Sequence, residues 1–279
     1  MGRLHDTVFI TLTNCPIRGT LSATMSILSN LLQTIEDGEI LDARIGLHWT
    51  AVLARCGGER RLGLAATLHG EHNHTRTPDV PQAGALESLP GRELAQYVLS
   101  DRPALASLGL AAVNALLPAP PPPDSEESGE RLLVRLGQGR RVALVGHFPF
   151  VDVLRQAVGR LDVLELSPGP GDLPAELAPE VLPQADVIAI TGMTLSNHTL
   201  ESLLRLRPPQ AVVILIGPST PPSPVFYDYG VDILAGALVT AIDPVLRSIS
   251  QGANFHQVRQ AGVRLVNWFR PGSPAAPAG

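Results

Sequence analysis

The sequence contains no lysine, so all 21 of its basic residues are arginines. Three kinds of chemistry depend on lysine: the phosphate contact in a nucleotide-binding loop, the Schiff base with pyridoxal phosphate or a carbonyl substrate, and proton abstraction by a neutral amine. The absence of lysine excludes all three for this chain. Pyridoxal phosphate is therefore excluded as a cofactor.

Long apolar runs and basic runs are also missing. No stretch reaches the roughly 18 uninterrupted apolar residues of a membrane-spanning helix, and the N-terminal sequence MGRLHDTVFI lacks the pattern of a signal peptide. The net charge of -5 is spread over both signs, which argues against nucleic acid and an anionic membrane as partners. We therefore expect a cytoplasmic protein with a small-molecule ligand, and we leave open whether it forms a homo-oligomer.

The sequence has only two cysteines, Cys15 and Cys56. Since the cytosol is reducing, we expect both to be free thiols. The 279 residues exceed the usual size of one domain, and 44% of them are hydrophobic, which is enough for two cores. The composition thus predicts a two-domain globular protein without a disulfide framework.

One segment has the composition of a linker. Residues 118–130, PAPPPPDSEESGE, combine a polyproline piece with an acidic piece. We therefore predict an N-terminal domain over residues 1–117 and a second domain over residues 131–271. The remaining residues, 272–279, form a tail rich in proline, alanine and glycine that we expect to be disordered.

The first unit shows strand patterns followed by helix patterns. Its first element, residues 22–35, has apolar residues at helical spacing. Residues 44–55 and 63–68 are typical of strands, and residues 91–98 and 107–116 are typical of helices. This order favours an α+β domain rather than a doubly wound sheet.

The second unit alternates between strands and helices. Its strand candidates are short and apolar on both faces, as expected for buried parallel strands: they are residues 141–145, 162–166, 186–190, 211–216 and 231–234. Helix candidates lie between and after them at residues 149–158, 175–181, 194–205 and 239–249. The alternation predicts a Rossmann-like parallel sheet, in which ligands bind beyond the carboxyl ends of the strands.

The first strand-to-helix turn lacks the GxGxxG motif of dinucleotide-binding folds. Its sequence is Val-Gly-His-Phe-Pro, in which only Gly146 fits the motif, and Pro149 removes a backbone N–H that could hold a phosphate. We therefore expect no tightly held dinucleotide. In dinucleotide-binding folds, an acidic residue that binds the ribose follows the glycine motif by roughly 20 residues, and Glu165 follows Gly146 at a similar spacing. A solvated carboxylate at the end of a strand would give the same sequence pattern.

Polar groups follow the other strand candidates. Thr191, Gly192, Thr194, Asn197 and Thr199 come after one strand. Each of the threonine and asparagine side chains could be an ordinary helix cap, but together at a strand end they suggest a ligand site. The turn Gly217-Pro218-Ser219 after the next strand supports the same site, with a simple turn as the alternative.

Histidines suggest two further kinds of chemistry. His69, His72 and His74 stand in one short loop, a composition that can bind a transition metal, although their spacing fits no defined zinc motif and a solvated loop is the alternative. His147, in the first strand-to-helix turn, is a candidate general base or a packed loop residue. Asn114, in an otherwise apolar helix, must bond either backbone or a ligand.

Several of these segments resemble one known family. IGLHWTAV (45–52), GLAAVNAL (109–116), ALVGHFPF (143–150), LELSPGPGDLP (164–174), ADVIAITGMTLSNHTL (185–200) and IGPSTPPSPVFYDYGVDILAG (216–236) follow one another as in the "putative heavy-metal chelation" family. The resemblance implies an enolase-N-terminal-like domain, then a Rossmann-like domain, with a site between them. The site residues it implies are Asn114, Gly146, Phe148, Pro149, Glu165, Asp172, Thr191, Gly192, Thr194, Asn197, Thr199, Gly217, Pro218 and Ser219.

Three functions follow as hypotheses. The leading one is that the protein binds a small heteroaromatic or nucleoside-like ligand between its domains and condenses or hydrolyses a metallophore, pterin or flavin-like precursor, with Glu165 or His147 as the catalytic acid or base. The second is a non-catalytic metal-binding protein that uses the His-rich loop. The third is a methyltransferase that uses S-adenosylmethionine, because that cofactor needs no pyrophosphate cradle.

Overall fold

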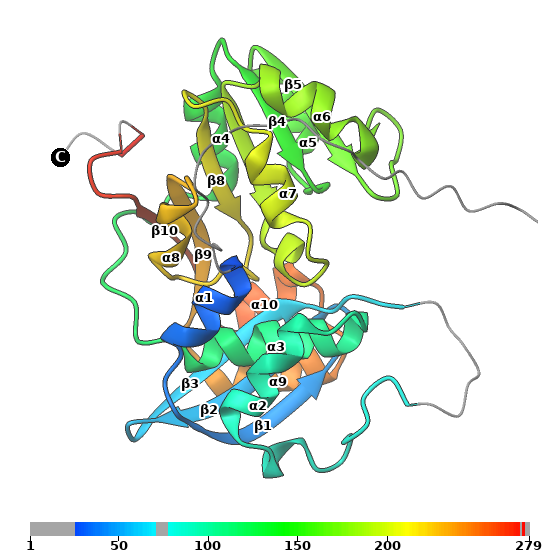
Figure 1. The fold of residues 1–279 in the computed structure, drawn as a ribbon, viewed down its shortest axis with the longest axis vertical. Coiled ribbons are helices and arrows are strands. Elements are labelled where there is room, and N and C mark those ends of the chain that lie inside the picture. The colour runs from blue at the N-terminus through cyan, green and yellow to red at the C-terminus, as the bar shows by residue number, and fades with distance from the viewer. Residues whose placement is uncertain (1–25, 71–77, 274, 277–279) are drawn as a thin grey trace, which may run out of the picture.

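The computed structural model describes residues 26–70, 78–273 and 275–276. Two β-sheets organise this part of the chain (Figure 1). The smaller sheet has three antiparallel strands, and the larger one has seven strands that are parallel except for one. The predicted α/β class is confirmed: a small antiparallel sheet precedes a larger, mostly parallel sheet.

The small sheet consists of β1 (Glu39–Ile45), β2 (Trp49–Cys56) and β3 (Glu59–Ala66). The prediction of a single strand over residues 44–55 was wrong, because the chain turns between β1 and β2, where the Gly46 N–H donates to the Trp49 carbonyl oxygen at 2.9 Å. Gly57 and Gly58 connect β2 to β3 with φ values of 54° and 91°, the left-handed conformation that a two-residue hairpin needs.

Side chains of β2 alternate between two helical layers. Val52 and Ala54 face α2 (Gly91–Gln96) and α3 (Pro103–Leu116), whereas Ala51 and Leu53 pack with residues of α9 (Ile242–Ser250) and α10 (Phe255–Gly262). In Figure 1, α3 lies in front of the small sheet and α9 lies behind it. Two helices from the C-terminal part of the chain therefore cover one face of the N-terminal sheet.

The large sheet has the strand order β10-β9-β8-β7-β4-β5-β6. The parallel strands are β4 (Arg141–Val145), β5 (Arg160–Glu165), β6 (Leu173–Pro174), β7 (Val187–Thr191), β8 (Val212–Ile216) and β9 (Ile233–Val239). The chain moves outward from β4 in one direction to β6 and then from β7 in the other direction to β9, so the order reverses between β4 and β7. Ligands of such sheets bind at this reversal.

The antiparallel edge strand, β10 (Val263–Phe269), was not predicted. It pairs along the whole of β9, which holds Val239 in a strand where the sequence suggested a helix. The acidic piece of the proline-rich segment lies along β10: Ser125 forms a bridge with Asn267, and the Asp124 carboxylate accepts the N–H of Phe269. The expected tail also begins packed, because Ser273 and Ala275 are buried.

Helices cover both faces of the large sheet. One face carries α4 (Gly129–Gly137) and α5 (Val151–Ala157). The other carries α6 (Ala178–Val181), α7 (Leu200–Arg205) and α8 (Val225–Asp228). Within the described ranges, no helix combines the length and hydropathy needed to cross a membrane.

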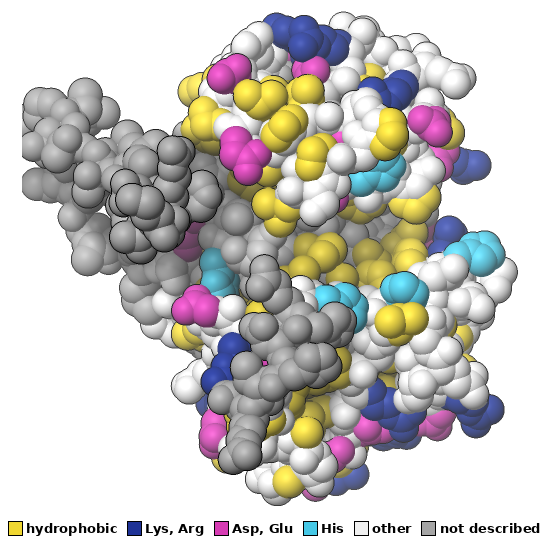
Figure 2. Space-filling view, turned by 90° about the vertical axis from the view of Figure 1, so that its right-hand side faces the viewer, with side chains coloured by type: hydrophobic (Ala, Val, Ile, Leu, Met, Phe, Trp, Pro, Cys, Tyr) yellow, Lys and Arg dark blue, Asp and Glu magenta, His cyan; other side chains and the backbone are white. Residues whose placement is uncertain are grey.

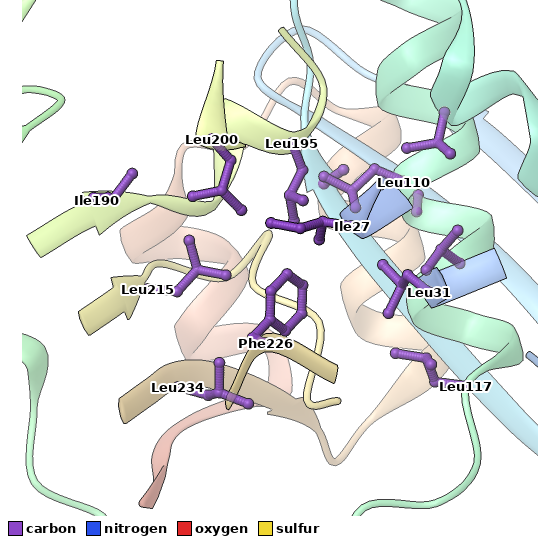
Figure 3. Packing of buried hydrophobic residues seen from close by; sticks show 14 of the residues in the cluster. Ile27, Leu31, Leu110, Leu117, Ile190, Leu195, Leu200, Leu215, Phe226 and Leu234 are labelled. Atoms are coloured by element: carbon purple, nitrogen blue, oxygen red, sulfur yellow. The ribbon is translucent and has the colours of Figure 1, made fainter. Parts of the chain in front are cut away.

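One hydrophobic cluster joins the two sheets. Figure 3 shows Phe226 of α8 between Leu215 and Leu234 of the large sheet on one side and Ile27 and Leu31 on the other. The last two residues belong to α1 (Ile27–Thr34), whose N-terminus is capped by the Ser26 hydroxyl accepting the Ser29 N–H. The cluster continues through α3, so the two predicted units share a core.

We expect a fragment ending at Leu117 to be unfolded. Trp49, Ala51, Leu53 and Leu64 would lose the cover of α9 and α10 and lie in water, and burial of such side chains is the main favourable term in folding. Circular dichroism and two-dimensional NMR of the fragment and of the full chain provide the measurement. A dispersed, folded spectrum of the fragment would contradict this expectation.

Candidate functional site

A cavity of about 670 Å³ lies at the carboxyl ends of β4, β5, β7 and β8. Its opposite wall comes from the small-sheet side of the molecule, through Trp49, Ala66, Leu68 and Phe255. Figure 2 shows a hollow across the middle of one face, with hydrophobic side chains inside it and histidine side chains above and below it. We call this hollow the strand-end cavity.

The turn between β4 and α5 forms one edge of the strand-end cavity. Gly146 has a φ of 101°, and a Cβ at this position would lie 3.1 Å from the Cβ of Thr191. The following His147, Phe148 and Pro149 all line the cavity. The Phe148 ring stacks on Phe150 at 5.2 Å, so it presents a supported aromatic surface.

Glu165, the last residue of β5, is fixed by backbone groups. One carboxylate oxygen accepts the N–H of His147 at 3.0 Å, and the other accepts the N–H of Leu166 at 2.7 Å. A carboxylate offers about four lone-pair positions. Both oxygens of Glu165 therefore keep the capacity to accept a second hydrogen bond.

The loop after β7 satisfies many of its own polar groups. Thr194 donates its hydroxyl to the Thr191 carbonyl oxygen at 2.7 Å, and the Asn197 side-chain oxygen accepts both the N–H and the hydroxyl of Thr199. These bonds stay within the loop, and of the four residues only Thr191 caps a helix, because its hydroxyl accepts the Met193 N–H. All four residues nevertheless line the strand-end cavity.

Three of the predicted ligand-binding residues do not line the cavity: Asn114, Asp172 and Gly192. The Asn114 amide donates to the carbonyl oxygens of Leu64 at 2.8 Å and Ser219 at 3.2 Å, and the Ser219 hydroxyl accepts the N–H of Ala66 at 2.9 Å. Asn114 thus ties α3 and β3 to the loop after β8. At Gly192, a Cβ would lie 2.8 Å from the Thr220 nitrogen, so glycine permits close loop packing.

The cavity brings together most of the strand-end residues predicted from the sequence. The predicted residues that line it are Gly146, His147, Phe148, Pro149, Glu165, Thr191, Thr194, Asn197, Thr199, Gly217, Pro218 and Ser219. Sequence reasoning missed the apolar wall. Trp49 and Phe255, whose rings lie 5.2 Å apart, have the sequence signal of ordinary core residues.

The His-rich loop is only partly described. The His69 Nε2 atom hydrogen-bonds the Leu47 carbonyl oxygen at 2.9 Å, whereas His72 and His74 lie outside the described residues. In the described ranges, no three His, Cys, Asp or Glu side chains gather as metal ligands. Cys56 is a free, buried thiol whose pKa is raised by burial, and Cys15 lies outside the described residues.

Fold and cavity together define a two-sheet α/β protein with a ligand-sized cavity at the strand reversal of its Rossmann-like sheet. The chain belongs to the family described as "Putative heavy-metal chelation". Two family models with that description match it, one over residues 28–117 and the other, DUF364, over residues 131–267.

Three similar proteins each match most of this chain. An uncharacterised protein of Methanocaldococcus jannaschii is 28% identical over 230 residues, which cover 78% of this chain and 86% of the relative. A solved DUF364 structure of unknown function from Desulfitobacterium hafniense is 27% identical, with a TM-score of 0.72 over 88% of this chain and 98% of its own. One from Pyrococcus horikoshii is 22% identical, has a TM-score of 0.69 and the same coverage, and supports the fold alone.

Proposed function

We propose that the strand-end cavity binds a small heteroaromatic or nucleoside-like molecule. The observation that carries this proposal is the position of Glu165, which ends β5 beside the β4 turn and lines the cavity. In Rossmann-like sheets an acidic residue at this place binds ribose hydroxyls. Each oxygen of the Glu165 carboxylate uses one lone pair to accept a backbone N–H. The second lone pair of each oxygen can accept a hydrogen bond from one hydroxyl of a diol.

The size and lining of the cavity support a molecule of this kind. Ligand pockets commonly measure about 300–1,000 Å³ and combine apolar walls with a few polar groups. Here the stacked Phe148 ring and the Trp49 and Phe255 side chains suit a planar ring system. The turn after β4 offers only Gly146 in place of a pyrophosphate cradle, which favours a nucleoside or pterin over a dinucleotide.

The family description supplies the wider role. We propose that the bound molecule is a metal-chelating compound, or a precursor of one that the protein condenses or hydrolyses. In this proposal the organic molecule, rather than a protein side chain, binds the metal ion. This assignment rests on the family description together with the organic character of the cavity lining. We expect His147 and Glu165, which both line the cavity, to carry the acid–base chemistry of this step.

The test is a ligand screen with the full-length protein. Adenosine, S-adenosylhomocysteine, neopterin and riboflavin are added at millimolar concentration, and the melting temperature is compared with that of the free protein. A compound at 100 times its Kd stabilises the folded state by about 2.7 kcal/mol, which raises the melting temperature by roughly 5–10 °C in a chain of this size. The proposal fails if no compound of the panel produces a shift and mass spectrometry finds no organic molecule in the purified protein.

The same screen separates the other two hypotheses. A shift with S-adenosylhomocysteine but not with adenosine favours a methyltransferase. For direct metal binding, equilibrium dialysis against nickel, zinc, iron and copper compares the natural chain with a His69→Ala, His72→Ala, His74→Ala variant. Loss of a bound ion in that variant alone favours the chelating loop.

A further inference from the structure

His147, which follows β4, is held by two carboxylates: Glu165 at the end of β5 and Asp172 in the loop between β5 and β6. Its backbone N–H donates to Glu165, and its ring Nδ1 lies 2.8 Å from the carboxylate of Asp172. The same Asp172 oxygen accepts the N–H of Gly169 at 3.2 Å. Both the backbone and the ring of His147 are thereby fixed in orientation.

Asp172 is suited to orient a ring rather than to contact a ligand. Its side chain is 2% exposed, and its second oxygen has no hydrogen-bond partner among the described residues. The Arg155 guanidinium lies 3.6 Å from that oxygen and also donates to the Gly171 carbonyl oxygen. A buried carboxylate needs such partners, because desolvation of an unpaired charge is costly.

The hydrogen bond determines which ring nitrogen carries the proton. A carboxylate only accepts hydrogen bonds, so the neutral His147 ring must carry its proton on Nδ1. Nε2 is then an unprotonated base that points away from Asp172, and it has no hydrogen-bond partner among the described residues. The His147 side chain is 48% exposed and lines the strand-end cavity.

We propose that His147 and Asp172 form a proton-transfer dyad, in which His147 Nε2 takes a proton from a molecule in the strand-end cavity and Asp172 is the positioning residue. The O–H bond of a ligand hydroxyl or a bound water breaks, its electron pair stays on oxygen, and an N–H bond forms at Nε2. The resulting imidazolium is stabilised by the Asp172 carboxylate, and the reverse step returns the proton. The proposal rests on the proposed function, because it needs a molecule in the cavity.

The first test does not need a ligand. Long-range proton–nitrogen NMR of the ¹⁵N-labelled full chain at about pH 8.5, above the ordinary histidine pKa of about 6.5, reports the tautomer of each ring. We expect an Nδ1–H ring for His147. His69 and His198 are internal controls, since their Nε2 atoms lie 2.9 Å and 2.8 Å from carbonyl oxygens and must carry the proton.

Two variants complete this measurement. His147→Gln identifies the resonance. Asp172→Ala removes the acceptor that holds the proton on Nδ1, so we expect its His147 to lose the preference for the Nδ1–H tautomer while His198 stays unchanged. If the His147 ring of the natural protein carries its proton on Nε2, that result alone overturns the dyad. An Nδ1–H ring that persists in a folded Asp172→Ala protein also overturns it.

The second test asks whether Nε2 faces a bound molecule. Diethyl pyrocarbonate acylates unprotonated ring nitrogens, so we expect modification of His147 at Nε2 and protection by adenosine, both measured by peptide mass spectrometry. If adenosine raises the melting temperature without protecting His147, the dyad does not face the ligand and the inference is wrong. If adenosine does neither while the tautomers are as expected, the nucleoside proposal is what fails.

Discussion

Glu165→Gln is expected to abolish the preference of the protein for adenosine over 2′,3′-dideoxyadenosine. The proposed function assigns the two hydroxyls of adenosine to the lone pairs of the Glu165 carboxylate that backbone N–H groups leave free. Hydrogen bonds to a charged group contribute about 1.5–3 kcal/mol. We therefore expect a preference of about 10- to 100-fold in Kd. Isothermal titration of both compounds against both proteins measures it.

A matched control comes from the same region. Glu180 is an exposed carboxylate on α6 that does not line the strand-end cavity, so Glu180→Gln should retain the full preference for adenosine. Equal affinity of the natural protein for the two compounds would refute diol binding. A preference that survives in Glu165→Gln would assign it to another residue.

Gly109→Ala is expected to destabilise the protein strongly, although alanine is the better helix former. Glycine in a helix interior costs about 1 kcal/mol relative to alanine, so propensity alone predicts a gain. However, Gly109 lies in the middle of α3, and a Cβ there would be 1.9 Å from the backbone nitrogen of Val98. Such overpacking costs up to about 3 kcal/mol or more, and we expect the clash to dominate.

The measurement is thermal unfolding of two glycine variants. For Gly109→Ala we expect the melting temperature to fall by roughly 5–10 °C, from a net loss of about 2 to 3 kcal/mol. For Gly70→Ala, where the nearest atoms to a Cβ are 3.8 Å away, we expect a change within about 0.5 kcal/mol. Equal stability of the two variants would contradict the close packing of α3.

The sequence predicted β4, β7 and β8 well because each is buried on both faces and therefore shows an unbroken apolar run. It did not predict β10, in which Arg264 and Asn267 interrupt the apolar pattern. Asn267 is almost completely buried, and its amide donates to the Glu127 carbonyl oxygen. The partner that makes this polar residue tolerable lies far away in the sequence, so no local pattern reveals it.

The candidate site was predictable where topology alone determines it. Loops after adjacent parallel strands must meet at one edge of the sheet, which brings Gly146, Glu165 and Thr191 together. The opposite wall depends on how the small sheet packs, and an apolar residue such as Phe255 gives the same signal in a core and in a cavity. The Asp172–His147 hydrogen bond depends on the path of the loop after β5, which sequence spacing does not specify.

The interleaved packing of the two sheets also constrains how such a protein can evolve. α9 and α10 return from the second unit to cover the first, and α1 packs against α8. A genetic crossover within the proline-rich segment would combine the small sheet of one protein with the α9 and α10 helices of another, and those helices would not match the sheet that they have to cover. Although that segment has the sequence of a linker between exchangeable modules, the two halves should be inherited as a single unit.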